Sequence, residues 1–333
     1  NGFLVLSFLA ALPTAAQTFQ AASQLSFTKP FAGADPLPQI LTVGSSGANF
    51  SFSATATTSS GGSWLSISPS GNGCCTTPAP ITVTVTTGAA LAAGVYSGQI
   101  TLKSYPTATV TMNITVTLTV TSAGPFFDNV PGQMSFSLKT GGAAPPFQLL
   151  QIRNKGTGSL PWTASKTTVD GGNWLAVSSA SGTAPSILAV TVTPANLPGG
   201  GLTPGTFVGE LTFTTTGSSV TVPVAVVVGD SVFNQVNPIS FTMPLAGANP
   251  LPQTLSISST GSNFSFSVAS ATATGGAWLQ VSPLGNGCCT APGAVTVSIT
   301  APPALPAGTY TGEVTFTQYP NRSFSMTVPV TLT

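Results

Sequence analysis

A long segment of this chain occurs twice without losing register. Leu25–Cys75 begins LSFTKPFAGADPLPQIL and ends WLSISPSGNGCC, and Ile239–Cys289 begins ISFTMPLAGANPLPQTL and ends WLQVSPLGNGCC. Trp278 follows Trp64 at an offset of 214 residues (278 − 64), which is also the offset between the two cysteine pairs. A more divergent copy around Trp174 lies between them. An internal repeat of this kind predicts a tandem array of similar units.

Three closing phrases divide the array. AGVYSGQITL, PGTFVGELTF and AGTYTGEVTF each end one copy. We therefore expect an N-terminal segment at 1–16, unit 1 at 17–122, unit 2 at 123–228 and unit 3 at 229–333.

The pattern inside a unit predicts an all-β fold. Stretches such as SFSATAT, ITVTVTT and TVTMNITVTLTV alternate apolar and polar residues, and turns rich in Gly, Asn and Pro separate them. About seven short strands per unit are typical of an immunoglobulin-like sandwich. The sequence therefore predicts three tandem immunoglobulin-like β-sandwich domains, with Trp64, Trp174 and Trp278 buried in their cores rather than serving as ligand platforms.

The charged residues argue against catalysis. The chain has no His, and its formal net charge is +1, which provides no basic face for nucleic acid. The carboxylates are Asp35, Asp128, Asp170, Glu210, Asp230 and Glu313. Only Glu210 and Glu313 occupy matching positions, where unit 1 has Gln99, and we interpret them as solvated charges at strand edges. The sequence predicts no enzyme, no cofactor and no metal site.

The N-terminal segment is apolar and ends in small residues. It has the form of a secretion signal with its cleavage site, and it is too short to span a membrane as a helix. The alternative is a retained strand that packs on a neighbouring subunit, with candidate residues Phe3, Leu4, Val5, Leu6, Phe8, Leu9 and Leu12. Both interpretations predict export.

The four cysteines form two adjacent pairs in predicted loops, Cys74 with Cys75 and Cys288 with Cys289. Export favours disulfides. A bridge between neighbours is strained, because adjacent Cα atoms lie about 3.8 Å apart. Bridges between subunits are the main alternative; free thiols or a metal site, which would lack further ligands, are weaker ones.

The run W-L-x-[IV]-S-P-x-G followed by A-G-x-Y-x-G-x-[IV]-T resembles the BACON-type and related immunoglobulin-like repeats of bacterial secreted proteins. It occurs as WLSISPSG with GVYSGQIT, as WLQVSPLG with GTYTGEVT, and in weaker form as WLAVSSASG with GTFVGELT. The resemblance implies extracellular spacers, adhesins, or proteins that bind or degrade glycans.

These observations favour a non-catalytic extracellular structural protein on the bacterial cell surface. A surface of Ser, Thr, Gly and Ala provides little repulsion between copies, so we expect the chain to bind copies of itself in a filament, a pilus-like fimbrium or a surface layer. The alternative is a glycan-binding or adhesin module of a larger secreted protein. A fragment of an enzyme is a third hypothesis, and it would need a catalytic domain outside this chain.

Overall fold

The computed structural model describes residues 17–87, 91–302 and 305–333. Within these ranges the protein is built from β-strands, and its only helical turns are the 3₁₀ turns η1 (Pro194–Asn196) and η2 (Pro198–Gly201). The candidate assembly strand at residues 3–12 lies outside the described residues.

Unit 1 is a sandwich of two sheets. The five-stranded sheet has the order β2-β9-β8-β4-β6, and the four-stranded sheet has the order β1-β3-β7-β5. The strands are β1 (Phe19–Gln20), β2 (Gln24–Pro30), β3 (Gln39–Ser45), β4 (Ser51–Thr58), β5 (Leu65–Ser68), β6 (Gly71–Thr76), β7 (Ala79–Val85), β8 (Gly94–Ser104) and β9 (Thr111–Thr121).

Units 2 and 3 repeat this arrangement with a five-stranded and a three-stranded sheet each. Their sheets have the orders β10-β17-β16-β12-β14 with β11-β15-β13, and β18-β25-β24-β20-β22 with β19-β23-β21. The strands of unit 2 are β10 (Met134–Leu138), β11 (Gln148–Ile152), β12 (Leu160–Thr168), β13 (Leu175–Val177), β14 (Ser181–Ala184), β15 (Ser186–Val192), β16 (Gly205–Thr215) and β17 (Ser218–Val228). Those of unit 3 are β18 (Ile239–Phe241), β19 (Gln253–Ile257), β20 (Phe264–Thr272), β21 (Leu279–Ser282), β22 (Gly285–Ala291), β23 (Gly293–Ile299), β24 (Tyr310–Tyr319) and β25 (Ser325–Leu332).

The first strand of each five-stranded sheet lies parallel to the last strand of its unit. The parallel pairs are β2 with β9, β10 with β17, and β18 with β25, whereas the other pairs are antiparallel. Two packed sheets with short connections are the architecture of an immunoglobulin-like sandwich. The prediction of three tandem all-β sandwiches is confirmed.

Each core is centred on one tryptophan. Trp64, Trp174 and Trp278 are at most 2% exposed. The indole N–H of Trp64 donates to the Ser60 carbonyl at 2.9 Å, and that of Trp278 donates to the Thr274 carbonyl at 2.8 Å. These bonds satisfy the only polar atom of each buried indole ring.

A glycine in each closing phrase makes room for this tryptophan. A Cβ atom at Gly98 would lie 3.3 Å from the Trp64 ring, and one at Gly312 would lie 3.2 Å from the Trp278 ring. Both distances are shorter than ordinary carbon contacts of 3.5–4.0 Å. The glycine of G-x-[IV]-T in the repeated phrase is therefore required for the tryptophan to pack in the core.

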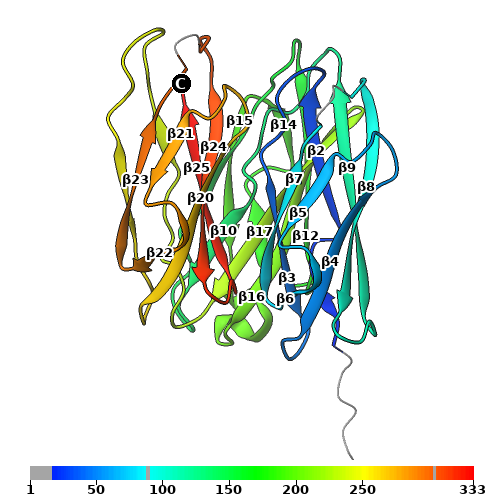
Figure 1. The fold of residues 1–333 in the computed structure, drawn as a ribbon, viewed down its shortest axis with the longest axis vertical. Helices are drawn as coiled ribbons and strands as arrows, with labels where there is room; N and C mark the ends of the chain where they lie inside the picture. The colour runs from blue at the N-terminus through cyan, green and yellow to red at the C-terminus, as the bar shows by residue number, and fades with distance from the viewer. Residues whose placement is uncertain (1–16, 88–90, 303–304) are drawn as a thin grey trace, which may run out of the picture.

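The three units pack side by side, with their strands running along the long axis of the molecule (Figure 1). Strands β2 and β3 of unit 1 lie against β17 of unit 2, and β10 of unit 2 lies against β25 of unit 3. The same faces therefore meet at both interfaces. The residue bounds of the three units, 17–122, 123–228 and 229–333, remain a prediction from the sequence.

Candidate functional site

The cysteine pairs lie in edge strands, so the prediction that they lie in loops was wrong. Cys74 is bonded to Cys75 in β6, and Cys288 is bonded to Cys289 in β22. Each strand pairs with its neighbour across an irregularity in register, between Phe52 and Ala54 in unit 1. A bulge at an edge accommodates residues that do not fit a regular ladder, which explains why adjacent bridged cysteines can sit there.

An exposed tyrosine packs beside each cysteine pair. The ring of Tyr105 lies 3.0 Å from the position of a Cβ at Gly73, and Tyr105 is 48% exposed. Tyr319, which is 41% exposed, lies against Gly287 in the same way. Both glycines have positive φ angles, of 59° and 58°, so glycine suits these positions of β6 and β22 in conformation as well as in space. Units 1 and 3 thus present the same aromatic surface.

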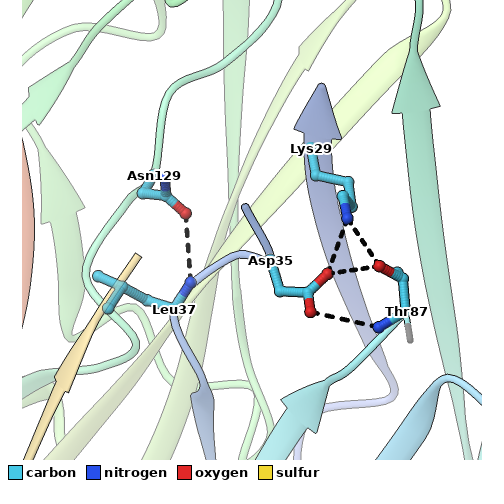
Figure 2. Close-up of polar contacts among 5 residues, drawn as sticks. All are labelled: Lys29, Asp35, Leu37, Thr87 and Asn129. Carbon is cyan, nitrogen blue, oxygen red and sulfur yellow. Dashed lines mark hydrogen bonds and ion pairs between the residues drawn. The ribbon is translucent and has the colours of Figure 1, made fainter. Parts of the chain in front are cut away.

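A buried ion pair ties the start of unit 1 together (Figure 2). Lys29 Nζ donates to Asp35 Oδ1 at 2.8 Å and to the Thr87 hydroxyl at 2.8 Å, and the Thr87 hydroxyl also donates to Asp35 Oδ1. Close by, the Leu37 N–H donates to Asn129 Oδ1 at 3.2 Å, which joins unit 1 to the segment that enters unit 2. Lys29 is only 5% exposed, and its partners compensate for the cost of burying the charge. The cluster is structural.

All three units meet at Gly132. Its carbonyl accepts from the Ile40 N–H of unit 1 at 2.9 Å, and its N–H donates to Glu313 Oε2 of unit 3 at 2.9 Å. A Cβ at this position would collide with the Pro38 carbonyl oxygen. Only glycine fits between units 1 and 3 here.

The two matched glutamates are buried at the junctions between units, so the interpretation as solvated edge charges was wrong. Glu313 is 2% exposed and Glu210 is 3% exposed. Burial raises the pKa of Glu313 to about 7, although the hydrogen bond from Gly132 lowers it. Burial likewise raises the pKa of Glu210 to about 7, against the lowering effect of hydrogen bonds from Thr212 and Gln24. Loss of hydration disfavours the charged carboxylate, and within the described residues neither glutamate forms an ion pair that would offset this loss.

The interface between units 1 and 2 is a small polar network around Thr221. The Ser26 N–H donates to Thr221 Oγ1 at 2.8 Å, and Thr221 Oγ1 donates to Gln39 Oε1 at 2.9 Å. Gln39 Nε2 donates in turn to the Thr221 carbonyl at 3.0 Å. Thr221 is fully buried, and both its hydroxyl and its carbonyl have partners in unit 1, which fixes the register of the two units.

The interface between units 2 and 3 uses Ser135 and Thr327, the positions that correspond to Ser26 and Thr221. The Thr327 N–H donates to Ser135 Oγ at 3.1 Å, and Ser325 Oγ donates to Gln133 Oε1 at 3.2 Å. Sequence reasoning missed this network. Its members are Ser, Thr and Gln at strand positions that a single sandwich would expose to water, so only their recurrence at matched positions could have indicated it.

Several hollows border these junctions, and two of them lie beside residues already described. One, of about 850 Å³, lies beside Leu149, Asn237 and Ser240, where units 2 and 3 meet. The other, of about 490 Å³, lies between the Cys74–Cys75 pair and the Asn321 turn of unit 3. Within the described ranges there is no group of three or more His, Cys, Asp or Glu side chains that could hold a metal ion. In the same part of the chain, no helix has the length and apolar character needed to cross a membrane.

Comparison with known families gives a match within unit 2. Residues 132–227 match the family model of the viral BACON domain. The resemblance to BACON-type domains is therefore shown at this coarse level, and the bacterial source and the secreted-repeat character remain predictions. No curated protein matches the chain in sequence.

Solved structures with similar folds include extracellular and enzymatic proteins. Drosophila N-cadherin EC1-4 is 11% identical over 96% of this chain and 76% of its own, with a TM-score of 0.25. Mouse cadherin-23 EC22-24 is 12% identical over 95% of this chain and 98% of its own, with a TM-score of 0.23. An endo-fucoidan hydrolase of glycoside hydrolase family 107 is 14% identical over 92% of this chain and 42% of its own, with a TM-score of 0.22. At these scores the similarity carries no argument about function.

Proposed function

We propose that this chain is a non-catalytic extracellular structural protein that assembles with copies of itself on the cell surface, as a filament, fimbrium or surface layer. One observation carries the proposal. The two glutamates with raised pKa values, Glu210 and Glu313, are at most 3% exposed at junctions between units, and Glu313 also lines a hollow of about 400 Å³ between units 1 and 3. Each carboxylate accepts a hydrogen bond from a neighbouring unit, from Gln24 Nε2 to Glu210 and from the Gly132 N–H to Glu313, which favours a role in joining units over acid or base catalysis.

The surface chemistry agrees with this function. Only 4% of the residues are charged, so two copies can approach with little electrostatic repulsion at any ionic strength. The described strands also carry exposed apolar side chains, such as Leu149 and Ile187 on one sheet face. Such patches mark interaction surfaces.

Electron microscopy and sedimentation velocity of the purified chain, over a range of concentrations, test the proposal. We expect ordered assemblies that grow with concentration and persist in high salt. A chain that remains a single copy throughout would contradict self-assembly. Deletion of Asn1–Ala16, with a separate export signal, tests the candidate assembly strand: loss of assembly would assign it a role, and unchanged assembly would leave the sandwich surfaces responsible.

Glycan binding is a second candidate function, favoured by the exposed tyrosines beside the cysteine pairs. Tyr105 and Tyr319 present the same aromatic surface twice, and aromatic faces are suited to stacking on sugar rings. Glycan-array binding that is lost in a Tyr105→Ala/Tyr319→Ala double variant would support this function. Leu284→Ala, which alters a non-aromatic side chain that is more exposed than either tyrosine, serves as the control.

A further inference from the structure

Unit 1 has a docking face that unit 2 covers. Its members come from β2, β3 and the turn between them, and they are Ser26, Thr28, Leu37 and Gln39. Their exposed fractions are 6%, 7%, 4% and 2%, because unit 2 and the segment that leads into it lie on them. We call this set the docking face of unit 1.

Unit 3 has the same docking face, but it is open. The corresponding residues, each 214 positions later, are Ser240, Thr242, Leu251 and Gln253, so all four side chains are identical to those of unit 1. Leu251 is 86% exposed, whereas Leu37 is 4% exposed. Burying an apolar side chain of this size favours association, so the exposed Leu251 can contribute to binding once the face is covered.

The open face already has the conformation of the covered one. Gln253 Nε2 donates to the Ser240 carbonyl at 2.8 Å, just as Gln39 Nε2 donates to the Ser26 carbonyl at 3.0 Å. Because this bond holds the Gln253 side chain in place before any contact forms, docking costs less side-chain entropy.

The surface that receives a docking face is also open in one unit. In units 2 and 3 it is centred on Thr221 and Thr327, which are 0% and 3% exposed. The strand register places Asn113 of unit 1 at the same position: Asn113 pairs with Thr101, as Thr221 pairs with Thr212. Asn113 is exposed, and its amide can both donate and accept a hydrogen bond, as the Thr221 hydroxyl does. We call this surface of unit 1 the receiving face.

We propose that the docking face of unit 3 binds the receiving face of unit 1 in a second copy of this chain, through the contacts by which unit 1 binds unit 2. The proposal rests on the proposed self-assembly and specifies its surface. Because the two faces differ, the contact is heterologous: a first dimer leaves one face of each kind free, and copies add head to tail.

A second patch supports the same geometry. Ile40 in unit 1 is 3% exposed, because it lies beneath the Gly132 junction with unit 3, two units along. Gln148 Nε2 of unit 2 donates to the Ser135 carbonyl, as Gln39 Nε2 of unit 1 donates to the Ser26 carbonyl, so the two glutamines are equivalent. Leu149, the residue after Gln148, therefore corresponds to Ile40. Leu149 is 53% exposed. In the proposed assembly the units follow in the order 1, 2, 3 and then unit 1 of the second copy. That unit 1 lies relative to unit 2 as unit 3 lies relative to unit 1, and it would cover Leu149.

Besides the exchange of Thr221 for Asn113, the open faces differ from the covered ones at a further pair of positions. Glu210 faces Gln24 across the first interface, but the corresponding residues of the open faces are Gln99 and Pro238. The contact between copies would therefore bury no carboxyl group. In a Gln99→Glu variant, the introduced carboxyl would be exposed in a single copy and would become buried only when a second copy covers the face.

Sedimentation velocity of the full chain and of three variants tests the proposal. Leu251→Asp alters the docking face and Asn113→Arg alters the receiving face; both positions are exposed, so the fold is expected to be kept, and near-ultraviolet circular dichroism checks it. Each variant alone should associate at least tenfold more weakly than the unaltered chain. Mixed together they should form a 1:1 complex that does not grow, because each retains one intact face. Leu284→Asp, at a side chain of unit 3 that is 62% exposed, is the matched control and should assemble normally.

Each contrary outcome has a definite meaning. If Leu251→Asp assembles like the control, the inference about this face is wrong, while self-assembly itself stands on other surfaces. If the unaltered chain never associates, both the inference and the proposed self-assembly are wrong. As an independent measurement, assembly of Gln99→Glu should weaken when the pH is raised from about 5 to about 8, and pH-independent assembly of this variant would also contradict the inference.

Discussion

Glu313 shows how a single side chain can make the contact between units depend on pH. The pKa of its carboxyl rises from an ordinary 4.5 to about 7, chiefly because burial disfavours the charge. Below pH 4.5 the carboxyl binds a proton in both the folded and the unfolded state, so it makes no difference to stability there. Between pH 4.5 and 7 only the folded state holds the proton, and stability falls as the pH rises; above 7 the loss is complete.

Glu313→Gln should remove this dependence. The unaltered chain is expected to lose on the order of 3 kcal/mol of stability from this group between pH 4.5 and 7, at about 1.4 kcal/mol per pH unit. The variant should lose only what Glu210 contributes. Urea unfolding monitored by tryptophan fluorescence at pH 5, 6, 7 and 8 measures the difference. Gln99→Glu, examined in dilute solution, is the control, because it puts a carboxyl at the matching exposed position; equal pH dependence of Glu313→Gln and the unaltered chain would contradict the assignment.

The burial of these glutamates illustrates a limit of prediction from sequence. Their matched positions in units 2 and 3 were visible, but a carboxylate in an alternating strand normally faces water. What buries Glu313 is Gly132, a residue far away in sequence whose N–H reaches the carboxylate. A contact between domains leaves no periodic trace within either strand, so neither the burial nor the pKa shift could be foreseen.

At the scale of the strand, the edge strands β6 and β22 were harder to predict than the strands around them. The alternating segments of β4, β7 and β9 follow the apolar and polar pattern directly. GNGCC has no such pattern and was assigned to a loop, yet it pairs with β4 in unit 1 and with β20 in unit 3. A bulged edge strand is specified by the partner that it lies against rather than by its own alternation.

Both cysteine pairs are expected to be oxidised in the mature protein. Intact mass should rise by two hydrogens per bridge on reduction, and alkylation without reductant should modify no cysteine. A Cys74→Ser/Cys75→Ser variant should show half of that change, since only the pair in unit 3 remains. Four alkylatable thiols would contradict the prediction, and a covalent ladder on a non-reducing gel would assign the bridges to contacts between subunits instead.

At the scale of the molecule, the repeat predicted the number and class of the domains but not their arrangement. Tandem sandwiches can be joined end to end or packed side by side, and the strand pattern is the same in both cases. Here the choice depends on Ser26, Gln39 and Thr221, which look like ordinary exposed strand residues until the two units meet. Polar interfaces of this kind carry no hydrophobic signal in the sequence.

The parallel pairing of first and last strands has a mechanical consequence. A pull on the two ends of a unit draws the paired strands past each other, so their hydrogen bonds are loaded together in shear instead of opening one at a time. In unit 1 this clamp involves all seven residues of β2, and in unit 2 the five of β10. Unit 1 should therefore resist tension better than unit 2.

Force spectroscopy on single molecules should find that unit 2 ruptures before unit 1. A Gly-Ser insertion after the exposed Ala144 would lengthen the extension released by unit 2 and so identify its step. Rupture of unit 1 at a lower force than unit 2 would show that clamp length does not set the order. If the order holds, unit 2 would lengthen under tension while unit 1 still bears the load, which is the behaviour of a graded shock absorber.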